Sequence, residues 1–182
     1  MFVIIEGMDR CGKTTLIKNL RKSYFKNPRT IVHHSSSPPK VDDPSKWEEE
    51  HYRHLFHTFA YMSNCNDYDI ILDRFHLGSV VYGKKYRNID EDAIFTIDKH
   101  YHTYYPNMYL IVLVDEPSEI IKRDDGDSLE TSIDDYEYTK TEFEKCFEKS
   151  HCRNKLLINV SRNGGFQNTL PTVTDFLEGM KE

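Results

Sequence analysis

The sequence predicts an α/β fold in which a five-stranded parallel sheet lies between two layers of helices. Short apolar runs alternate along the chain with longer segments whose apolar residues recur at helical spacing. The third and fourth runs are continuously apolar, as in strands buried on both faces of a parallel sheet. The five runs cover residues 2–6, 30–34, 69–74, 108–115 and 155–160. At 182 residues, we expect a three-layer sandwich formed by one domain, residues 1–182.

The first run leads into a glycine-rich motif. Gly7 and Gly12 are separated by four residues, Lys13 and Thr14 follow, and a helical pattern begins at once. In this context the backbone N–H groups can surround a polyphosphate, Lys13 reaches its β- and γ-phosphates, and the Thr14 hydroxyl holds Mg²⁺. We therefore expect ATP to bind here with Mg²⁺. The predicted binding residues are Gly7, Asp9, Arg10, Cys11, Gly12, Lys13, Thr14 and Thr15.

Helical patterns separate the apolar runs. They cover Leu16 to about residue 27, Pro44 through Met62, Ile89 to Tyr105, a segment opening at Pro117, Ile133 to Lys149, and Leu170 to Met180. Residues 75–85 receive no assignment. The second of these helices carries histidines at 51, 54 and 57. A metal site and a hydrogen-bonding surface both fit this spacing, and the lack of a carboxylate or thiolate in register favours the surface.

A second chemical site is predicted where the third apolar run ends in Asp73 and Arg74. A carboxylate at a strand end beside a phosphate loop can hold Mg²⁺, and an adjacent arginine can bind a phosphate with two hydrogen bonds. Asp115 ends the fourth run and is a rival metal ligand. Asp73 is preferred because an arginine accompanies it.

The segment near 122–132 is polar and contains a glycine, so it suits a lid over the phosphates. It begins with Lys122 and Arg123 and continues with three aspartates, so an ordinary acidic loop is the alternative. Arg10 lies inside the phosphate loop, where backbone N–H groups already hold the donor phosphates, and the lid offers few cations of its own. We therefore assign Arg10 to the phosphoryl group in transfer, as an arginine finger supplied in cis.

Charge and cysteine content restrict the class of protein. The net charge of −6 argues against, without excluding, electrostatic binding of long nucleic acid, and it favours a small anionic ligand. The four cysteines form no Cys-x-x-Cys pair, and no signal peptide or long apolar run is present. We expect a reduced, cytoplasmic compartment and no membrane contact. Cys146, His151 and Cys152 lack a fourth metal ligand at matching spacing, so helix-end packing is favoured.

The motifs together resemble those of a known family. Phe2 to Thr15 looks like the thymidylate kinase phosphate loop, including its Asp-Arg between the glycines, and Asp73 to Tyr82 is similar to that family's Asp-Arg-Tyr segment with a later aromatic residue. Over nearly all of its length the chain resembles the thymidylate kinase and deoxynucleoside (monophosphate) kinase group of P-loop kinases. The resemblance implies the P-loop kinase version of the sandwich.

The resemblance also implies roles for residues on the acceptor side. Asp9 would approach the sugar 3′-hydroxyl and Arg74 the acceptor phosphate. Tyr82 would lie beneath the deoxyribose, and Phe56 would stack on the base. Two positions depart from the family pattern. Residues 33–38 replace an arginine-containing segment, and Ala60 replaces the arginine that reads thymine.

These observations predict an ATP- and Mg²⁺-dependent kinase of a deoxynucleoside monophosphate. The expected catalytic residues are Lys13, Arg10, Asp73, Arg74 and Arg123, with Thr14 and Asp73 as the metal ligands. One alternative is phosphorylation of a hydroxyl on a deoxynucleoside or on a hydroxymethylated DNA base. A cellular nucleoside kinase would show a carboxylate after the second strand, and none lies between His33 and Lys40. A non-catalytic nucleotide switch is the other alternative, and a homodimer is left open.

Overall fold

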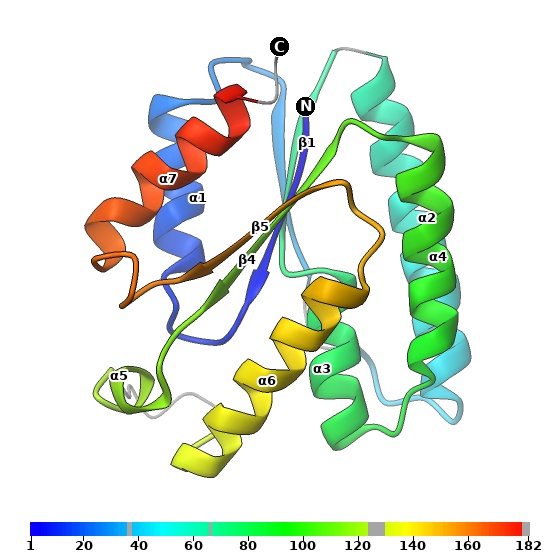
Figure 1. The fold of residues 1–182 in the computed structure, drawn as a ribbon. Helices are drawn as coiled ribbons and strands as arrows, with labels where there is room; N and C mark the ends of the chain where they lie inside the picture. The colour runs from blue at the N-terminus through cyan, green and yellow to red at the C-terminus, as the bar shows by residue number, and fades with distance from the viewer. Residues whose placement is uncertain (36–37, 66, 124–129, 180–182) are drawn as a thin grey trace.

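A sheet of five parallel strands organises the chain in the computed structural model, which describes residues 1–35, 38–65, 67–123 and 130–179. The strands are β1 (Phe2–Gly7), β2 (Thr30–His34), β3 (Asp69–Asp73), β4 (Met108–Val114) and β5 (Asn154–Asn159). Their order in the sheet is β2-β3-β1-β4-β5. The predicted α/β sandwich with five parallel strands is confirmed (Figure 1).

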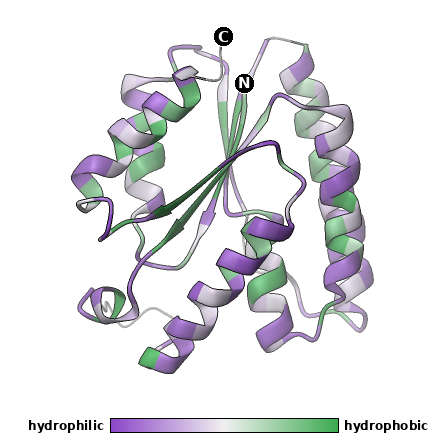
Figure 2. Cartoon of the chain, viewed as in Figure 1, coloured by the Kyte–Doolittle hydropathy of each residue, from purple (hydrophilic) through white to green (hydrophobic). Residues whose placement is uncertain are grey.

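Helices cover both faces of the sheet. They are α1 (Lys13–Ser23), α2 (Pro44–Asn64), α3 (His76–Tyr86), α4 (Glu91–Tyr104), α5 (Pro117–Ile121), α6 (Ile133–Lys149) and α7 (Phe166–Gly179). Figure 1 shows α1 and α7 together on one side of the sheet, and α2, α3, α4 and α6 on the other. Hydrophobic residues run along the central strands between these layers (Figure 2). Within the described ranges, no helix combines the length and the apolar character needed to cross a bilayer.

Strand register brings the predicted chemical residues to one edge of the sheet. Ile5 of β1 lies opposite Asp73 of β3, and Asp73 lies opposite His34 of β2. From β1 the chain continues to β2 and β3 on one side of β1, and the connection after β3 then crosses to β4 on its other side. Ligands bind beyond the carboxyl ends of the strands at such a switch point. The fold therefore places the phosphate loop next to the end of β3.

The structure differs from the sequence-based assignment at two helices. Residues 76–86 form α3, for which no helix was assigned. Most of α3 is buried, so it lacks the one-sided apolar pattern that marks a surface helix. The last helix begins at Phe166 and not at Leu170, with Pro171 inside it. Its first turn contributes only Thr169 to the buried residues, so the apolar spacing begins later than the helix.

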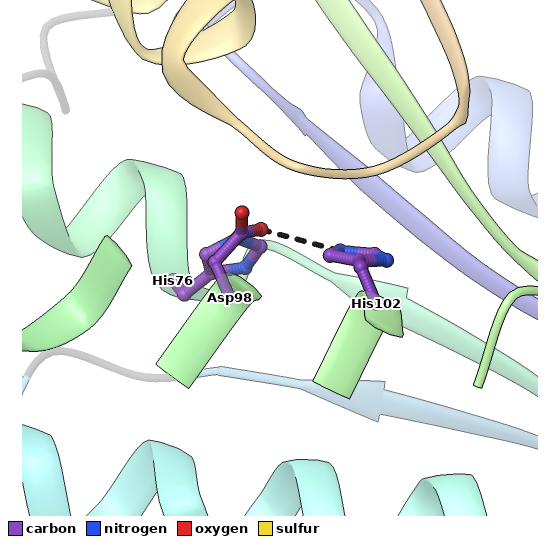
Figure 3. Close-up of side chains that lie close together, drawn as sticks. All are labelled: His76, Asp98 and His102. Atoms are coloured by element: carbon purple, nitrogen blue, oxygen red, sulfur yellow. Dashed lines mark hydrogen bonds and ion pairs between the residues drawn. The ribbon is translucent and has the colours of Figure 1, made fainter. Parts of the chain in front are cut away.

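A buried polar cluster joins α3, α4 and the turn after α6 (Figure 3). The Asp98 carboxylate pairs with His76 Nε2 at 2.8 Å and His102 Nε2 at 3.2 Å, and accepts hydrogen bonds from Ser150 Oγ at 3.0 Å and the His151 N–H at 2.6 Å. Burial would raise the pKa of Asp98, but the close interactions with His102 and His76 outweigh it and hold the pKa well below its usual range. The ligand atoms lie within 4.8 Å of one another, as metal ligands would. Asp98 accepts hydrogen bonds from His76, Ser150 and His151, which favours a hydrogen-bond network, while His76 Nδ1 and His102 Nε2 have no hydrogen-bond partner among the described residues.

Replacing Asp98 by alanine should destabilise the fold strongly. The change leaves buried donors on His76, Ser150 and His151 without their acceptor, and removal of one partner from a buried charged network costs about 3–5 kcal/mol. Urea unfolding followed by circular dichroism measures the loss. Because the pKa of Asp98 is depressed, this contribution is present above about pH 4 and is lost as the pH falls further. The exposed Asp175→Ala serves as the control and should stay within about 0.5 kcal/mol of wild type. Equal stability of the two variants would contradict the assignment.

Candidate active site

The glycine-rich loop between β1 and α1 has glycines where its backbone requires them. Gly7 has a φ of 132°, and a Cβ there would lie 1.9 Å from the carbonyl oxygen of Leu113 in β4. Gly12 has a φ of 80° and precedes α1 as its N-cap, without any capping side chain. The first N–H groups of α1 therefore lack a side-chain acceptor, which is the arrangement that binds anions at helix N-termini.

Lys13 is held beneath this loop with 4% of its side chain exposed. Its ammonium donates to the carbonyl oxygens of Gly7 at 2.9 Å and Met8 at 2.6 Å, and lies 3.9 Å from Asp9 Oδ1. Burial lowers the pKa of Lys13, and the neighbouring Asp9 opposes that effect. The charge is thus concentrated at the loop, where a polyphosphate would need it.

Three other predicted loop residues differ in exposure. Cys11 is fully buried, and burial raises the pKa of its thiol to about 12, so it contributes to packing and not to chemistry. Thr14 and Thr15 are exposed on the first turn of α1. The Thr14 hydroxyl is therefore accessible to a ligand beside the loop.

Asp9 and Arg74 form an ion pair that links the phosphate loop to the end of β3. Arg74 Nη2 donates to Asp9 Oδ1 at 2.7 Å. Burial would lower the pKa of Arg74, but its hydrogen bond with Asp9 outweighs this and raises it. Arg74 also has a φ of 62°, and its N–H donates to the Ile5 carbonyl at 3.0 Å. Such left-handed backbone is uncommon for a residue with a side chain and concentrates at functional sites.

The structure separates the two candidate metal carboxylates. Asp73 is largely buried and pairs through Oδ2 with His34 Nδ1 at 3.0 Å, while its enclosed Oδ1 has no hydrogen-bond partner among the described residues. Asp115 is fully engaged, since it accepts from Arg123 at 2.7 Å and from the N–H groups of Glu116 and Ser161 at 2.9 Å each. An oxygen without a donor suits a hard cation. This geometry supports Asp73 over Asp115 as the Mg²⁺ ligand.

Two further arginines lie at the loop, Arg10 within it and Arg123 beside it. Arg10, with a φ of 62°, donates through Nη1 to the Tyr136 hydroxyl of α6 at 2.7 Å. Arg123 is held by Asp115, and its guanidinium carbon lies 4.6 Å from the centroid of the Phe166 ring. Residues 124–129 of the expected lid lie outside the described residues, so only its two ends are placed.

A cavity of about 560 Å³ opens beside the phosphate loop, within the size range of small-molecule sites. Its lining residues are Glu6, Gly7, Asp9, His34, Ser35, Pro38, Tyr52, Arg74, Phe75, Gly78, Ser79, Tyr82, Tyr86 and Arg87. The predicted Asp9, Arg74 and Tyr82 are therefore brought together. The hydroxyls of Tyr82 and Ser35 are enclosed and have no partner among the described residues. Enclosed polar atoms of this kind point to a ligand.

Phe56 does not line this cavity, which corrects the position expected for it. Its ring is completely buried and stacks on Tyr101 of α4 at 5.0 Å, with Phe75 against its edge at 4.6 Å. The aromatic ring that α2 contributes to the cavity is that of Tyr52, one helical turn earlier. A core ring and a cavity ring occupy the same apolar face of α2, so their roles could not be separated by helical spacing.

Glu6 was not identified as a site residue in the sequence analysis. A carboxylate within an otherwise apolar strand could have indicated it. Its side chain is fully buried at the cavity wall and accepts hydrogen bonds from the N–H groups of Phe75 and Leu77, each at 2.9 Å, and Gly78 at 3.2 Å. Burial raises the pKa of Glu6, and these hydrogen bonds oppose the increase. Glu6 therefore anchors the start of α3 to the central strand.

The histidines of α2 face other partners. His51 stacks on Trp47 at 4.5 Å, and His54 Nδ1 lies 3.3 Å from the Glu50 carbonyl. In the part of the chain that the structure describes, the histidine and carboxylate group close enough to hold a metal is the Asp98 cluster, which does not include them. Cys146 and Cys152 are both buried.

Three solved structures with the same architecture illustrate the similarity. The YorR protein from Bacillus subtilis, in complex with phosphorylated GDP, is similar with a TM-score of 0.70 and 18% identity, over 98% of this chain and 96% of that one. Thymidylate kinase from Ehrlichia chaffeensis is similar with a TM-score of 0.59 and 18% identity, over 100% of this chain and 97% of that one. Deoxyadenosine kinase from M. mycoides with bound dCTP is similar with a TM-score of 0.52 and 15% identity, over 98% of this chain and 100% of that one. No protein-family model matches the sequence, and no curated protein matches it significantly.

The chain therefore shares its fold with these nucleotide-binding and nucleotide kinase structures. The expected resemblance is thereby confirmed at the level of the fold, over nearly the whole chain. Identities of 15–18% do not carry an activity from these proteins to this one. The function must be argued from the side chains around the P-loop and the cavity.

Proposed function

We propose that this protein is an ATP- and Mg²⁺-dependent phosphotransferase that acts on a deoxynucleoside monophosphate. The observation that carries the proposal is the cavity of about 560 Å³ directly beside the P-loop, with Asp9 and Arg74 on the wall between the two. A donor triphosphate on the loop and an acceptor in the cavity would meet at that wall. The kinds of ligand named for the neighbouring structures agree with this arrangement.

The proposed residues act mainly by positioning and by neutralising charge, as phosphoryl transfer requires. Lys13 and the N–H groups at the start of α1 would hold the donor phosphates. Thr14 and Asp73 would hold Mg²⁺, which would offset charge on the donor phosphates. Arg10 would stabilise the group in transfer, with Arg123 as a second cation at the loop.

The acceptor side supports a phosphorylated acceptor over a free hydroxyl. A hydroxyl needs a general base, and the cavity lining contains two carboxylates, Glu6 and Asp9. Glu6 already accepts three backbone hydrogen bonds, and Asp9 is paired with Arg74. A phosphate acceptor needs no base and is favoured by the adjacent guanidinium of Arg74.

Incubation of the protein with Mg-ATP and each deoxynucleoside monophosphate should yield deoxynucleoside diphosphates and ADP. Chromatography of the nucleotides measures both products. Deoxynucleosides and an oligonucleotide with hydroxymethylated bases are assayed in parallel. Phosphorylation of either of these, without diphosphate formation from any monophosphate, would establish the hydroxyl acceptor instead. ATP binding without phosphoryl transfer to any of these acceptors would favour a nucleotide switch.

A further inference from the structure

We propose that Arg87 selects acceptors whose base carries an oxo group, as guanine and thymine do, over the amino bases adenine and cytosine. The inference rests on the proposed function, because it assumes that the cavity holds a nucleotide base. It concerns a group of three side chains at the cavity's far end, namely Arg87, Glu48 and Ser79. The following observations place and characterise this group.

The far end of the cavity is defined by α3. Phe75, Gly78, Ser79, Tyr82 and Tyr86 recur at helical spacing and all line the cavity. The helix starts next to Arg74 and ends before Arg87, which is roughly 16 Å further along at 1.5 Å per residue. The phosphate-binding end and the Arg87 end are therefore separated by the length of the helix. A monophosphate held at Arg74 would direct its base toward Arg87.

Arg87 forms a fixed ion pair with Glu48 of α2. Its Nε and Nη2 lie 3.0 and 2.9 Å from Glu48 Oε1, and the other carboxylate oxygen of Glu48 accepts from the Ser79 hydroxyl. Glu48 is 1% exposed, whereas Arg87 is 25% exposed. The carboxylate is thus buried behind the guanidinium, and Arg87 is the member of the pair that lines the cavity.

The charge balance of this group favours a neutral ligand. Glu48 compensates the charge of Arg87 at close range, so the far end of the cavity lacks the excess positive charge that would bind a second phosphate. The guanidinium still presents N–H groups, since Nη1 has no hydrogen-bond partner among the described residues. A guanidinium offers donors only and cannot accept a hydrogen bond.

Donors that are fixed in place discriminate between bases by their exposed edges. Guanine presents N7 and O6 as acceptors, and thymine presents O4. Adenine shares the N7 acceptor, so the discrimination rests on the neighbouring position, where adenine and cytosine carry an amino group and two sets of donors would face each other. A well-placed arginine contact to a base discriminates by about 10- to 100-fold. Arg87 should therefore favour dGMP and dTMP over dAMP and dCMP.

The test compares the four monophosphates in wild type and in a variant that removes the donors without leaving Glu48 unpaired. Glu48→Gln combined with Arg87→Gln replaces the ion pair by two neutral amides. In wild type, kcat/KM for dGMP and dTMP should exceed that for dAMP and dCMP about 10-fold or more. In the double variant the ratio should fall to within about threefold, because glutamine can both donate and accept. Calorimetric binding of the same monophosphates without ATP gives a second readout.

Two further variants make the result decisive. Arg87→Lys keeps a positive charge for Glu48 but loses the planar fork, so it should fold and still lose most of the discrimination. Arg53→Gln makes the same chemical change on the exposed face of α2, where Arg53 pairs with Glu49, and should leave the ratio unchanged. Equal use of all four bases by wild type, or discrimination that survives in the double variant and in Arg87→Lys, would overturn the inference. Selective binding without diphosphate formation would refute the proposed function and leave the role of Arg87 standing.

Discussion

Arg10→Gly is expected to lower kcat by about 10³–10⁵-fold with little change in KM. An arginine that stabilises the phosphoryl group only during transfer contributes to the transition state and not to substrate binding. The structure places Arg10 on the P-loop with its guanidinium anchored by Tyr136, so its position is defined before a ligand binds. Steady-state kinetics with Mg-ATP and the preferred monophosphate measure the effect.

The same substitution is favourable for the backbone. Arg10 has a φ of 62°, which glycine adopts without strain, so the variant should remain folded. Arg123→Ala provides the comparison, because Arg123 is the other arginine beside the loop and lies in the first residues of the expected lid. Near-normal kcat for Arg10→Gly together with a large loss for Arg123→Ala would transfer the role to the lid. Exposed Arg29→Gly controls for the loss of one surface charge.

Asp73→Asn is expected to reduce kcat by about 10²–10³-fold and to raise the Mg²⁺ concentration needed for half-maximal rate. The substitution keeps the size of the side chain but removes the negative charge next to the P-loop, and with it much of the attraction for a hard cation. The loss of one preorganised electrostatic contact at a reacting centre has an effect of this size. Magnesium titrations of the initial rate separate the two parameters.

A matched control for Asp73→Asn is Asp67→Asn. Asp67 lies before β3 on the opposite edge of the sheet, is exposed, and pairs with Arg29. Its loss should leave both kcat and the magnesium requirement unchanged. If Asp73→Asn shows the wild-type magnesium dependence, the metal ligand must be sought elsewhere, and the fully hydrogen-bonded Asp115 would have to rearrange to supply it.

The strands and the P-loop could be predicted because their signals are local. Continuous apolar runs specify buried parallel strands, and the spacing from Gly7 to Thr14 is specific for a phosphate loop. Parallel pairing then brings Asp73 to the loop through its register with Ile5, so its position beside the loop could be predicted from the strand end.

The rest of the site depends on contacts between distant segments. The three N–H groups that bind Glu6 come from residues about seventy positions later. Arg87 and Glu48 meet because the end of α3 packs near α2, which no local pattern reveals. Phe56 could not be distinguished from Tyr52 for a similar reason, since which ring reaches the cavity depends on how α4 covers α2.

The carboxylate of Glu6 has a geometric consequence for both proposed substrates. It belongs to β1, whose end becomes the P-loop, and it holds the first N–H groups of α3, which forms the long wall of the cavity. The proposed donor loop and acceptor wall are therefore joined through Glu6 at the middle of the sheet. The distance between the P-loop and the cavity is therefore set by the folded core. A lid would exclude water but would not determine that distance.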